Sequence, residues 1–399
     1  MNYTRRDWLR SASVLGGGLL TGAVGLSRPP ALSAPATPVS VAKCKTYEAR
    51  ELTATLAKMF DQIGGLGRIV NGKTVAIKIN MTGNSDYRVG RLSLAETHYT
   101  HPAVVGAAAS LMAKAGARRI RVLECPWSTA DPVEEVLLQA GLEPNDILRA
   151  AANVEFENTN GLGRGKKYSR FMIPTGGYVY PGFDLNHSYE ECDVFVSIAK
   201  LKEHATAGYT GAMKNCFGMA PVTIYGDNAG LDEPAPTPRG GRTPFHSGRR
   251  QPSKSAPQEK DPASSRQEGY RVPRIVTDLV SARPIHLAIV EGIQTLTGGE
   301  GPWIRGFAPA SPGLIIVGTN PVCTDAVSMA TMNFDPMADR GTAPFETCDS
   351  TLKLAEDVGI GTRDLRRIEV VGTPIKDAMF DFAGLRAERR KQPPQGRRG

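Results

Sequence analysis

The feature that most constrains the fold of this chain is a regular alternation of two kinds of segment. Apolar runs of strand length lie at residues 75–80, 120–124, 194–199, 286–291 and 313–317. Between them lie segments with apolar residues at helical spacing, among them residues 101–117, 274–282 and 321–332. Such alternation is typical of parallel strands joined by helices. It predicts an α/β fold, with a mostly parallel, doubly wound sheet and helices on both faces.

The run over residues 194–199 leads into a dense group of polar residues. Lys200, Lys202 and His204 follow it directly, and Lys214 comes ten residues later. Ligands of open α/β sheets bind beyond the carboxyl ends of the strands, so we take these four residues as candidate catalytic residues. Lys200 and Lys202 lie on the same side of an extended segment. The alternative is a solvated loop, because lysines are mostly exposed.

Polar residues that follow the other strands should reach the same edge of a parallel sheet. The candidate substrate-binding residues are Lys78, Asn80, Glu124, Asn215, Glu291 and Asp325. Asp325 begins a helical segment, where a carboxylate can also serve as a cap. The lysines outnumber the glutamates at this edge, so the sequence predicts that a small anion compensates them.

Several of these segments also match the motifs of a known family. The motifs are Val75-Ala-Ile-Lys-Ile-Asn80, Thr100-His-Pro102, Lys200-Leu-Lys-Glu-His204, Gly211-Ala-Met-Lys-Asn-Cys-Phe-Gly218, Gly299-Glu-Gly-Pro302 and Gly359-Ile-Gly361. On these residues the chain resembles the DUF362 family over about residues 73–372, less one insertion. The resemblance implies an α/β domain with its site at the lysine-rich strand end. It implies no substrate, because the chemistry of the family is not established.

The chain departs from the pattern of that family in two ways. Glu291 stands where the family has aspartate, and the ferredoxin-type cysteine clusters of many relatives are absent. The six cysteines include no C-x-x-C pair, so we expect no iron–sulfur cluster. Cys125 and Cys323, each beside a predicted strand, fit buried free thiols. Disulfide pairing cannot be deduced from the sequence.

The first 36 residues have the pattern of an export signal. Arg5 and Arg6 precede a weakly apolar, glycine-rich run over residues 11–26, and small residues at 34–36 suit cleavage. The paired arginines predict a twin-arginine (Tat) signal peptide over residues 1–36. We therefore expect the Tat translocase to export the chain to a periplasmic or other extracytoplasmic location. The apolar run is too short and too often interrupted by glycine for a stable membrane anchor.

The positive charge of the chain lies at its two ends. Of the formal net charge of +8, residues 1–34 carry +3 and residues 386–399 carry +5, which leaves a neutral body. A neutral body offers no electrostatic footprint for a phosphate backbone, so we expect no nucleic-acid partner. We expect residues 37–72 to form a linker and a helix. The basic residues 373–399 read as a disordered tail.

Residues 227–272 differ in composition from the rest of the predicted domain, which spans residues 73–372. They are rich in Pro, Gly, Ser and charged residues and contain almost no aliphatic side chains. Such a segment buries too little apolar surface to offset the entropy of ordering it. The composition predicts a disordered insertion, with His246 as a solvated histidine.

Three histidines are weak candidates for metal ligands. His98 and His101 are three residues apart, and His204 lies at the lysine-rich strand end. Two ligands do not make a site, and the sequence does not show that a third converges with them. A divalent metal therefore stays open as a cofactor.

Three functions are compatible with these residues. The first expectation is an exported enzyme that acts on a small anion, carboxylate or phosphate-like, with lysines neutralising charge and His204 as acid or base. Neighbouring lysines lower each other's pKa, so one could act as a base near neutral pH. The alternatives are a non-catalytic periplasmic ligand-binding protein and an accessory protein for redox or cofactor assembly. The sequence leaves the oligomeric state open.

Overall fold

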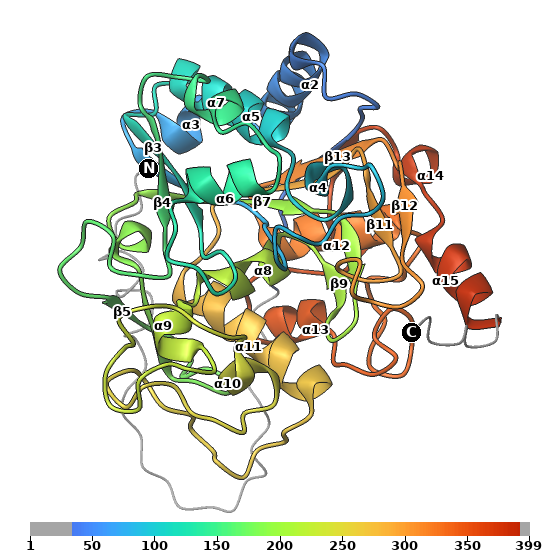
Figure 1. Ribbon diagram of the computed structural model, residues 1–399. Coiled ribbons are helices and arrows are strands. Elements are labelled where there is room, and N and C mark those ends of the chain that lie inside the picture. The colour runs from blue at the N-terminus through green and yellow to red at the C-terminus, as the bar shows by residue number, and fades with distance from the viewer. Residues whose placement is uncertain (1–33, 392–399) are drawn as a thin grey trace, which may run out of the picture. The chain divides into compact units, whose positions relative to one another are not determined.

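The computed structural model describes residues 34–391. They are built on an eight-stranded sheet with the strand order β14-β1-β13-β10-β7-β2-β3-β4 (Figure 1). The strands are β1 (Val39–Lys43), β2 (Thr74–Lys78), β3 (Arg119–Glu124), β4 (Val154–Asn158), β7 (Val194–Lys200), β10 (Leu287–Gly292), β13 (Leu314–Gly318) and β14 (Val370–Gly372). Only β13 runs antiparallel to its neighbours in this sheet. The predicted mostly parallel sheet is confirmed.

Helices cover both faces of this sheet, and each face has its own hydrophobic core. Successive residues of a strand point to opposite faces, so Phe195 of β7 belongs to one core and Val196 to the other. The core with Val196 includes α2 (Ala49–Gln62) and α5 (Pro102–Lys114). The core with Phe195 includes α11 (Glu268–Ala282), α12 (Pro321–Thr331) and α13 (Thr351–Asp357) (Figure 1). The predicted helices on both faces are confirmed.

Shorter elements connect these layers. The further helices are α3 (Gly67–Val70), α4 (Leu94–Thr97), α6 (Val133–Gln139), α7 (Asn145–Leu148), α8 (Ala212–Asn215), α9 (Val222–Tyr225), α10 (Thr243–His246), α14 (Ile375–Ala378) and α15 (Phe382–Lys391). Outside the main sheet, three antiparallel pairs form: β5 (Ser169–Met172) with β6 (Gly182–Leu185), β8 (Lys202–His204) with β9 (Gly208–Thr210), and β11 (Thr295–Thr297) with β12 (Ala308–Ala310).

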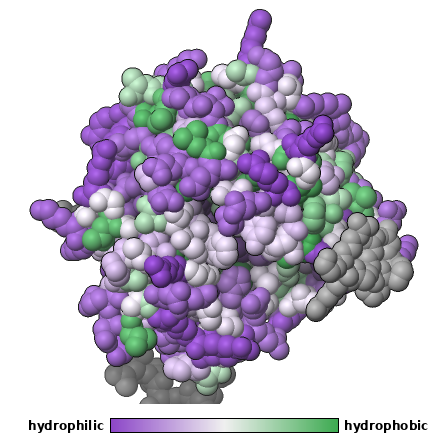
Figure 2. All heavy atoms as spheres, in the orientation of Figure 1, coloured by the Kyte–Doolittle hydropathy of each residue, from purple (hydrophilic) through white to green (hydrophobic). Residues whose placement is uncertain are grey.

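One face of the described part is largely polar. The face shown in Figure 2 is mostly hydrophilic, with hydrophobic residues in separate patches. None of the helices within residues 34–391 is both long and apolar enough to span a bilayer.

The N-terminal region contributes a strand that the sequence did not predict. Residues 37–72 contain the expected helix, α2, but the expected linker before it holds β1, which pairs with β13 and β14 in the main sheet. Val39 and Val41 of β1 are fully buried. Most of the predicted signal peptide, residues 1–33, lies outside the described residues.

Residues 227–272 follow a defined course along the domain, which differs from the predicted disorder. Phe245 is fully buried and packs against Tyr180, Phe183 and Tyr225. Polar contacts supply the rest of the order. The Glu259 carboxylate accepts hydrogen bonds from four side chains, those of Gln251, Ser264, Arg266 and Arg271. A count of aliphatic residues misses this kind of stabilisation, because buried charge-assisted hydrogen bonds replace apolar burial.

The described part of the predicted disordered tail is also structured. Residues 373–391 contain α14 and α15, and α15 docks on the domain through two arginines. Arg386 lies 2.7 Å and Arg389 2.8 Å from the carboxylate of Glu203, which is fully buried. Two of the basic residues of this tail thus pair with a buried acid, so the charge of the tail alone did not indicate disorder. Residues 392–399 lie outside the described residues.

Candidate functional site

The carboxyl ends of four parallel strands lie at one edge of the main sheet. Lys78 ends β2, Glu124 ends β3 and Lys200 ends β7. Lys200 is in register with Glu291 of β10, and Lys78 is in register with Ser197 of β7. The structure therefore brings the predicted strand-end residues to one edge, as parallel pairing requires. Their side chains, however, divide into two groups.

A cavity of about 590 Å³ opens at this edge. Its wall comes from the ends of β2 and β3, from β8, from α8 and the turn after it, and from the loop over residues 298–304. Six of the predicted site residues line it: Lys78, Asn80, Glu124, His204, Lys214 and Asn215. The others, Lys200, Lys202, Glu291 and Asp325, do not.

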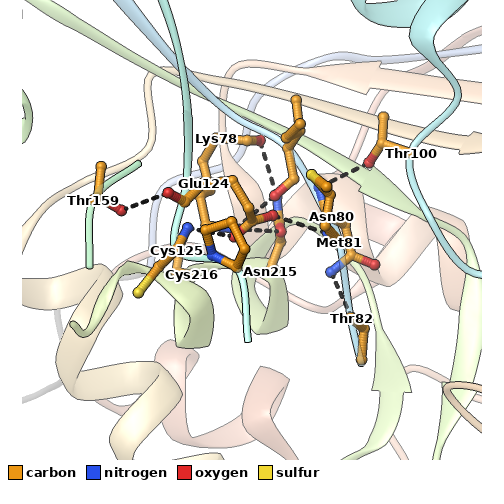
Figure 3. Close-up of polar contacts among 12 residues, drawn as sticks. Lys78, Asn80, Met81, Thr82, Thr100, Glu124, Cys125, Thr159, Asn215 and Cys216 are labelled. Carbon is orange, nitrogen blue, oxygen red and sulfur yellow. Dashed lines mark hydrogen bonds and ion pairs between the residues drawn. The ribbon is translucent and has the colours of Figure 1, made fainter. Parts of the chain in front are cut away.

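Lys78 and Glu124 form a buried ion pair in the cavity wall (Figure 3). Their closest atoms, Lys78 Nζ and Glu124 Oε1, are 2.6 Å apart, and Glu124 also accepts the backbone N–H groups of Met81 and Cys125. Asn215 positions Lys78 through two contacts. Its amide group donates to the Lys78 carbonyl, and its oxygen lies 3.3 Å from Lys78 Nζ. A Cβ at Gly218 would lie only 2.9 Å from Lys78 Nζ. Glycine there leaves the pair uncovered on the cavity side.

Lys214 presents a free amine to the cavity. Its Nζ lies 4.2 Å from the centre of the Phe217 ring, and it has no hydrogen-bond or ion-pair partner within residues 34–391. Burial lowers the pKa of Lys214 to about 7. The charge of Glu300 opposes this shift, and the smaller effects of Arg242 and Lys78 act in the same direction as burial. At neutral pH the amine is therefore present both as an ammonium ion and as a free base.

Arg242 is a second cation in the cavity wall without a carboxylate partner in the described part of the chain. Its Nε donates to the Ala220 carbonyl at 2.8 Å, and one terminal nitrogen lies 3.1 Å from Cys125 Sγ. These contacts fix the guanidinium group at the cavity without neutralising it. Because arginine stays charged at every pH of interest, Arg242 can hold an anion whatever the state of Lys214.

His204 faces the cavity as a neutral ring. Burial lowers the pKa of His204 to about 3, so the 3.7 Å approach of its Nδ1 to Glu300 is not an ion pair at neutral pH. Nδ1 accepts the N–H group of Thr206 at 3.1 Å. The neutral ring therefore carries its proton on Nε2, which makes His204 a hydrogen-bond donor toward a ligand.

Glu300 is a carboxylate whose position and ionised state are fixed by its neighbours. Its two oxygens accept the Ala205 N–H at 2.8 Å and the Trp303 Nε1–H at 3.1 Å. Burial alone would raise the pKa of Glu300, but His204, which is protonated at the low pH at which Glu300 titrates, and these donors lower it to about 2. Glu300 therefore stays ionised in the cavity wall.

Asn80 supplies an unused acceptor at the cavity. Its Nδ2 donates to Thr82 Oγ1 at 2.9 Å, and Figure 3 shows the carboxamide oxygen turned away from that contact. The oxygen is buried and has no hydrogen-bond partner in the described residues. A buried polar atom without a partner is costly, so this oxygen is a candidate contact for a ligand.

Lys200, Lys202 and Glu291 form the second group, which the structure places inside the protein and not at the cavity. All three are fully buried. Lys200 pairs with Glu291 and also donates to the carbonyls of Ala95 and Gln294, while Lys202 donates to the carbonyl of His98 at 2.8 Å. The two lysines do point to the same side, but that side is covered by α4. Through these hydrogen bonds the two lysines stabilise the packing of α4 and the turn after it against the sheet.

Asp325 caps a helix of the site and does not reach the cavity. Its oxygens accept the N–H groups of Ala212 and Met213 at 2.7 and 3.0 Å, which open α8. Burial raises the pKa of Asp325 to about 7. The capping role differs from the predicted one: Asn320 caps α12, the helix that contains Asp325, whereas Asp325 caps α8 and so positions the helix that carries Lys214.

The histidines do not converge on a metal site. His101 caps α5, with Nδ1 accepting the Ala103 N–H at 3.1 Å and its ring stacked on Tyr47. His98 is fully buried, and burial lowers its pKa to about 2. His204 lines the cavity, whereas His98 and His101 do not. Within residues 34–391, no three His, Cys, Asp or Glu side chains are grouped so that they could hold a metal ion.

The cysteines are buried free thiols, as predicted for Cys125 and Cys323. All six are buried and unpaired. Cys125 lines the cavity, where burial raises its pKa. It is therefore a neutral thiol and a poor nucleophile.

Sequence reasoning missed much of the cavity wall. The additional polar residues are Arg242, His246, Glu268 and Glu300, and the aromatic residues are Tyr87, Trp127, Phe217 and Trp303. His246 is not a solvated loop residue, because its ring packs edge-on against Phe217 at 5.3 Å. Phe245, one of two aromatic residues in the polar segment over residues 227–272, was the available signal that this segment packs.

The chain is similar to a family and to a few known proteins. A family model described as "Domain of unknown function (DUF362)" matches residues 75–330. A thylakoid-associated protein of Synechocystis is 32% identical over 187 residues, which cover 46% of this chain and 50% of that protein. The chain thus spans about half the length of this curated relative.

Two solved structures show weaker likeness. The lactate racemase apoprotein from Thermoanaerobacterium thermosaccharolyticum aligns with a TM-score of 0.35 at 13% identity, over 69% of this chain and 54% of that one. A protein from Thermotoga maritima aligns with a TM-score of 0.34 at 10% identity, over 67% of this chain and 55% of that one. Neither alignment is close enough to carry an argument about function.

Proposed function

The chain belongs to the DUF362 family, described as a domain of unknown function, and from that premise we propose that it is an enzyme acting on a small anionic substrate. The substrate binds in the strand-end cavity through a carboxylate or phosphate-like group. Arg242 holds that group, and Lys214 exchanges a proton with the substrate.

The observation that carries this proposal is the pair of uncompensated cations in the cavity wall. The other cation of the wall, Lys78, is paired with Glu124 at 2.6 Å. Lys214 and Arg242 have no carboxylate within ion-pair distance among residues 34–391. Two further carboxylates line the cavity without pairing with either cation. Glu268 lies 3.8 Å from His246, and Glu300 accepts the N–H groups of Ala205 and Trp303, although its charge does raise the pKa of Lys214. An anion that binds between the two free cations gains charge-assisted hydrogen bonds that the protein does not supply.

Proton transfer follows from the state of Lys214. A base works best when its pKa lies near the working pH, and the pKa of Lys214 is lowered to about 7. His204, neutral and protonated on Nε2, donates a hydrogen bond to a second polar group of the substrate. The buried thiol of Cys125 takes no part.

Sulfate binding tests the anion site, because sulfate keeps its charge across the useful pH range. We expect Lys214→Met and Arg242→Met each to weaken sulfate binding by about 1.5–3 kcal/mol in titration calorimetry at pH 6, with little change in melting temperature. Lys58→Met, which removes an exposed lysine on α2, should bind like the wild type. Equal sulfate affinity in all four proteins would contradict the proposed site.

Turnover distinguishes an enzyme from a binding protein. We expect the wild type to exchange carbon-bound hydrogen of a small aliphatic or aromatic carboxylic acid with D₂O, and Lys214→Met to lose this exchange. Proton NMR of the acids follows it directly. Sulfate binding without exchange in a broad panel of such acids would contradict the catalytic part and favour a ligand-binding protein.

Export by the Tat pathway remains part of the proposal. The paired arginines at positions 5 and 6 support it, and they lie outside the described residues. Replacing both with lysine keeps the charge and should retain the precursor in the cytoplasm. Unchanged export of the double variant would contradict the Tat assignment.

A further inference from the structure

One part of the cavity wall is aromatic and exposed. Trp127 is 43% exposed, Trp303 36% and Tyr87 40%, and all three line the cavity. They include both tryptophans of the described residues. Large rings gain free energy when they leave water. Three half-open rings around one cavity therefore indicate a surface that a ligand covers.

The Trp303 ring is held in place before any ligand binds. Its Nε1–H donates to Glu300, and its ring lies 5.1 Å from the Tyr87 ring. Two glycines leave space for the ring. A Cβ at either position would clash with Trp303, because it would lie 2.4 Å from the ring at Gly83 and 2.2 Å from it at Gly301. Gly83 also has a φ of +83°, which a side chain would disfavour. The wall is preorganised, which lowers the entropic cost of binding a ring.

Trp127 is positioned by an unusual turn. The next residue, Ser128, has a φ of +59°, which is rare for a residue other than glycine. Ser128 Oγ donates to the Gly240 carbonyl at 2.9 Å, which ties the turn to the segment that carries Arg242. Backbone strain of this kind is maintained where the surrounding structure requires it, and it is common at ligand sites. The same contact thus places an aromatic ring and a cation at one cavity.

The cavity is also larger than a simple anion needs. Its volume of about 590 Å³ lies in the range of sites for drug-sized ligands. Within it, the oxygen of Asn80 is an acceptor without a partner in the described residues, on a residue that is 7% exposed. A ligand that satisfies this oxygen must carry a hydrogen-bond donor.

We propose that the substrate is a planar ring that bears an acidic group. The ring stacks on Trp127 and Trp303, the acidic group lies between Lys214 and Arg242, and a hydroxyl or amine of the substrate donates to Asn80. The acidic end rests on the function proposed above, whereas the ring end rests on the aromatic wall alone. Trp127 and Trp303 are the residues that determine specificity.

Three sulfonates of equal charge test the ring separately from the anion. The probes are methanesulfonate, benzenesulfonate and cyclohexanesulfonate, titrated into the full chain by calorimetry. We expect benzenesulfonate to bind at least about tenfold more tightly than methanesulfonate, because stacking on an aromatic side chain contributes substantially to binding. It should also bind more tightly than cyclohexanesulfonate, which is apolar but not planar.

Variants then locate the effect. Trp127→Leu and Trp303→Leu should each reduce the preference for benzenesulfonate over methanesulfonate, measured with the same variant, to about threefold or less. Trp127→Phe keeps a ring and should keep most of the preference, and it serves if a leucine variant fails to fold. Leu138→Ala, which alters an exposed apolar residue of α6 outside the cavity, should change nothing.

Each result decides one question. Methanesulfonate binding with no preference for benzenesulfonate would overturn the ring inference and leave the anion site standing. Equal binding of cyclohexanesulfonate would overturn planarity as the basis of recognition. Failure of all three sulfonates to bind would overturn the proposed function, and the substrate class with it.

Discussion

Two lysine–glutamate pairs lie side by side at the same edge of the sheet, and they have different roles. Lys78 and Glu124 end β2 and β3, while Lys200 and Glu291 are register partners on β7 and β10. All four side chains are almost completely buried. The first pair borders the cavity and the second does not.

What covers each pair decides its role. Carbonyl groups of Ala95 and Gln294 accept hydrogen bonds from Lys200, and Glu291 accepts hydrogen bonds from the Tyr47 hydroxyl and the His101 backbone N–H. Over the Lys78 pair lies Gly218, which has no side chain to close the gap. The same kind of ion pair thus has two roles at equivalent strand ends. The Lys200 pair stabilises the packing of α4 on the sheet, and the Lys78 pair borders the candidate binding cavity.

The largest effect that separates the two pairs is on stability. We expect Lys200→Met to lower the free energy of unfolding by about 3–5 kcal/mol, because it leaves the Glu291 carboxylate buried without its counter-charge. Urea denaturation followed by circular dichroism measures this. Adding Glu291→Gln should restore part of the loss, and a double variant as unstable as the single one would contradict the ion-pair explanation.

A smaller loss is expected at the cavity. Lys78→Met should cost about 1–3 kcal/mol, since Glu124 keeps the N–H groups of Met81 and Cys125 and borders an open cavity. The same denaturation experiment makes the comparison. If Lys78→Met proved as costly as Lys200→Met, the distinction between the two pairs would not hold for stability.

Chemical reactivity sharpens the comparison without mutation. An aldehyde with a mild hydride donor modifies neutral, accessible amines, and at pH 7 Lys214 should react at least about tenfold faster than Lys200 or Lys202. Burial lowers the pKa of Lys202 as well, but its amine is fully buried and bonded to the His98 carbonyl. Peptide mass spectrometry over time gives the three rates. Modification of Lys202 as fast as Lys214 would show that α4 does not cover it.

The sequence predicted that both ion pairs lie at one edge of the sheet, but not that only one of them borders the cavity. Strand-length apolar runs fix the parallel order, and parallel order places Lys78, Glu124, Lys200 and Glu291 together. Which lysine is covered depends on backbone groups about one hundred residues away, such as the Ala95 carbonyl that receives Lys200. No local pattern reports such a contact.

The segment over residues 227–272 shows a second limit of sequence reasoning. Its composition argues against a core, yet it supplies Arg242 and His246 to the cavity. The order of this segment comes from Phe245 and from the hydrogen bonds of Glu259. Counting apolar residues measures only one of the ways in which a segment becomes ordered.

The pH dependence of sulfate binding tests the central claim, that Lys214 is the free cation of the cavity. Because the pKa of Lys214 is lowered to about 7, the ammonium form that attracts sulfate predominates below pH 7 and is lost above it. Affinity should therefore fall about tenfold between pH 6 and pH 8, with the population of the protonated form. The Lys214→Met variant should bind weakly and without this dependence. A wild-type affinity that stays constant up to pH 9, or a variant that keeps the same pH profile, would contradict the account.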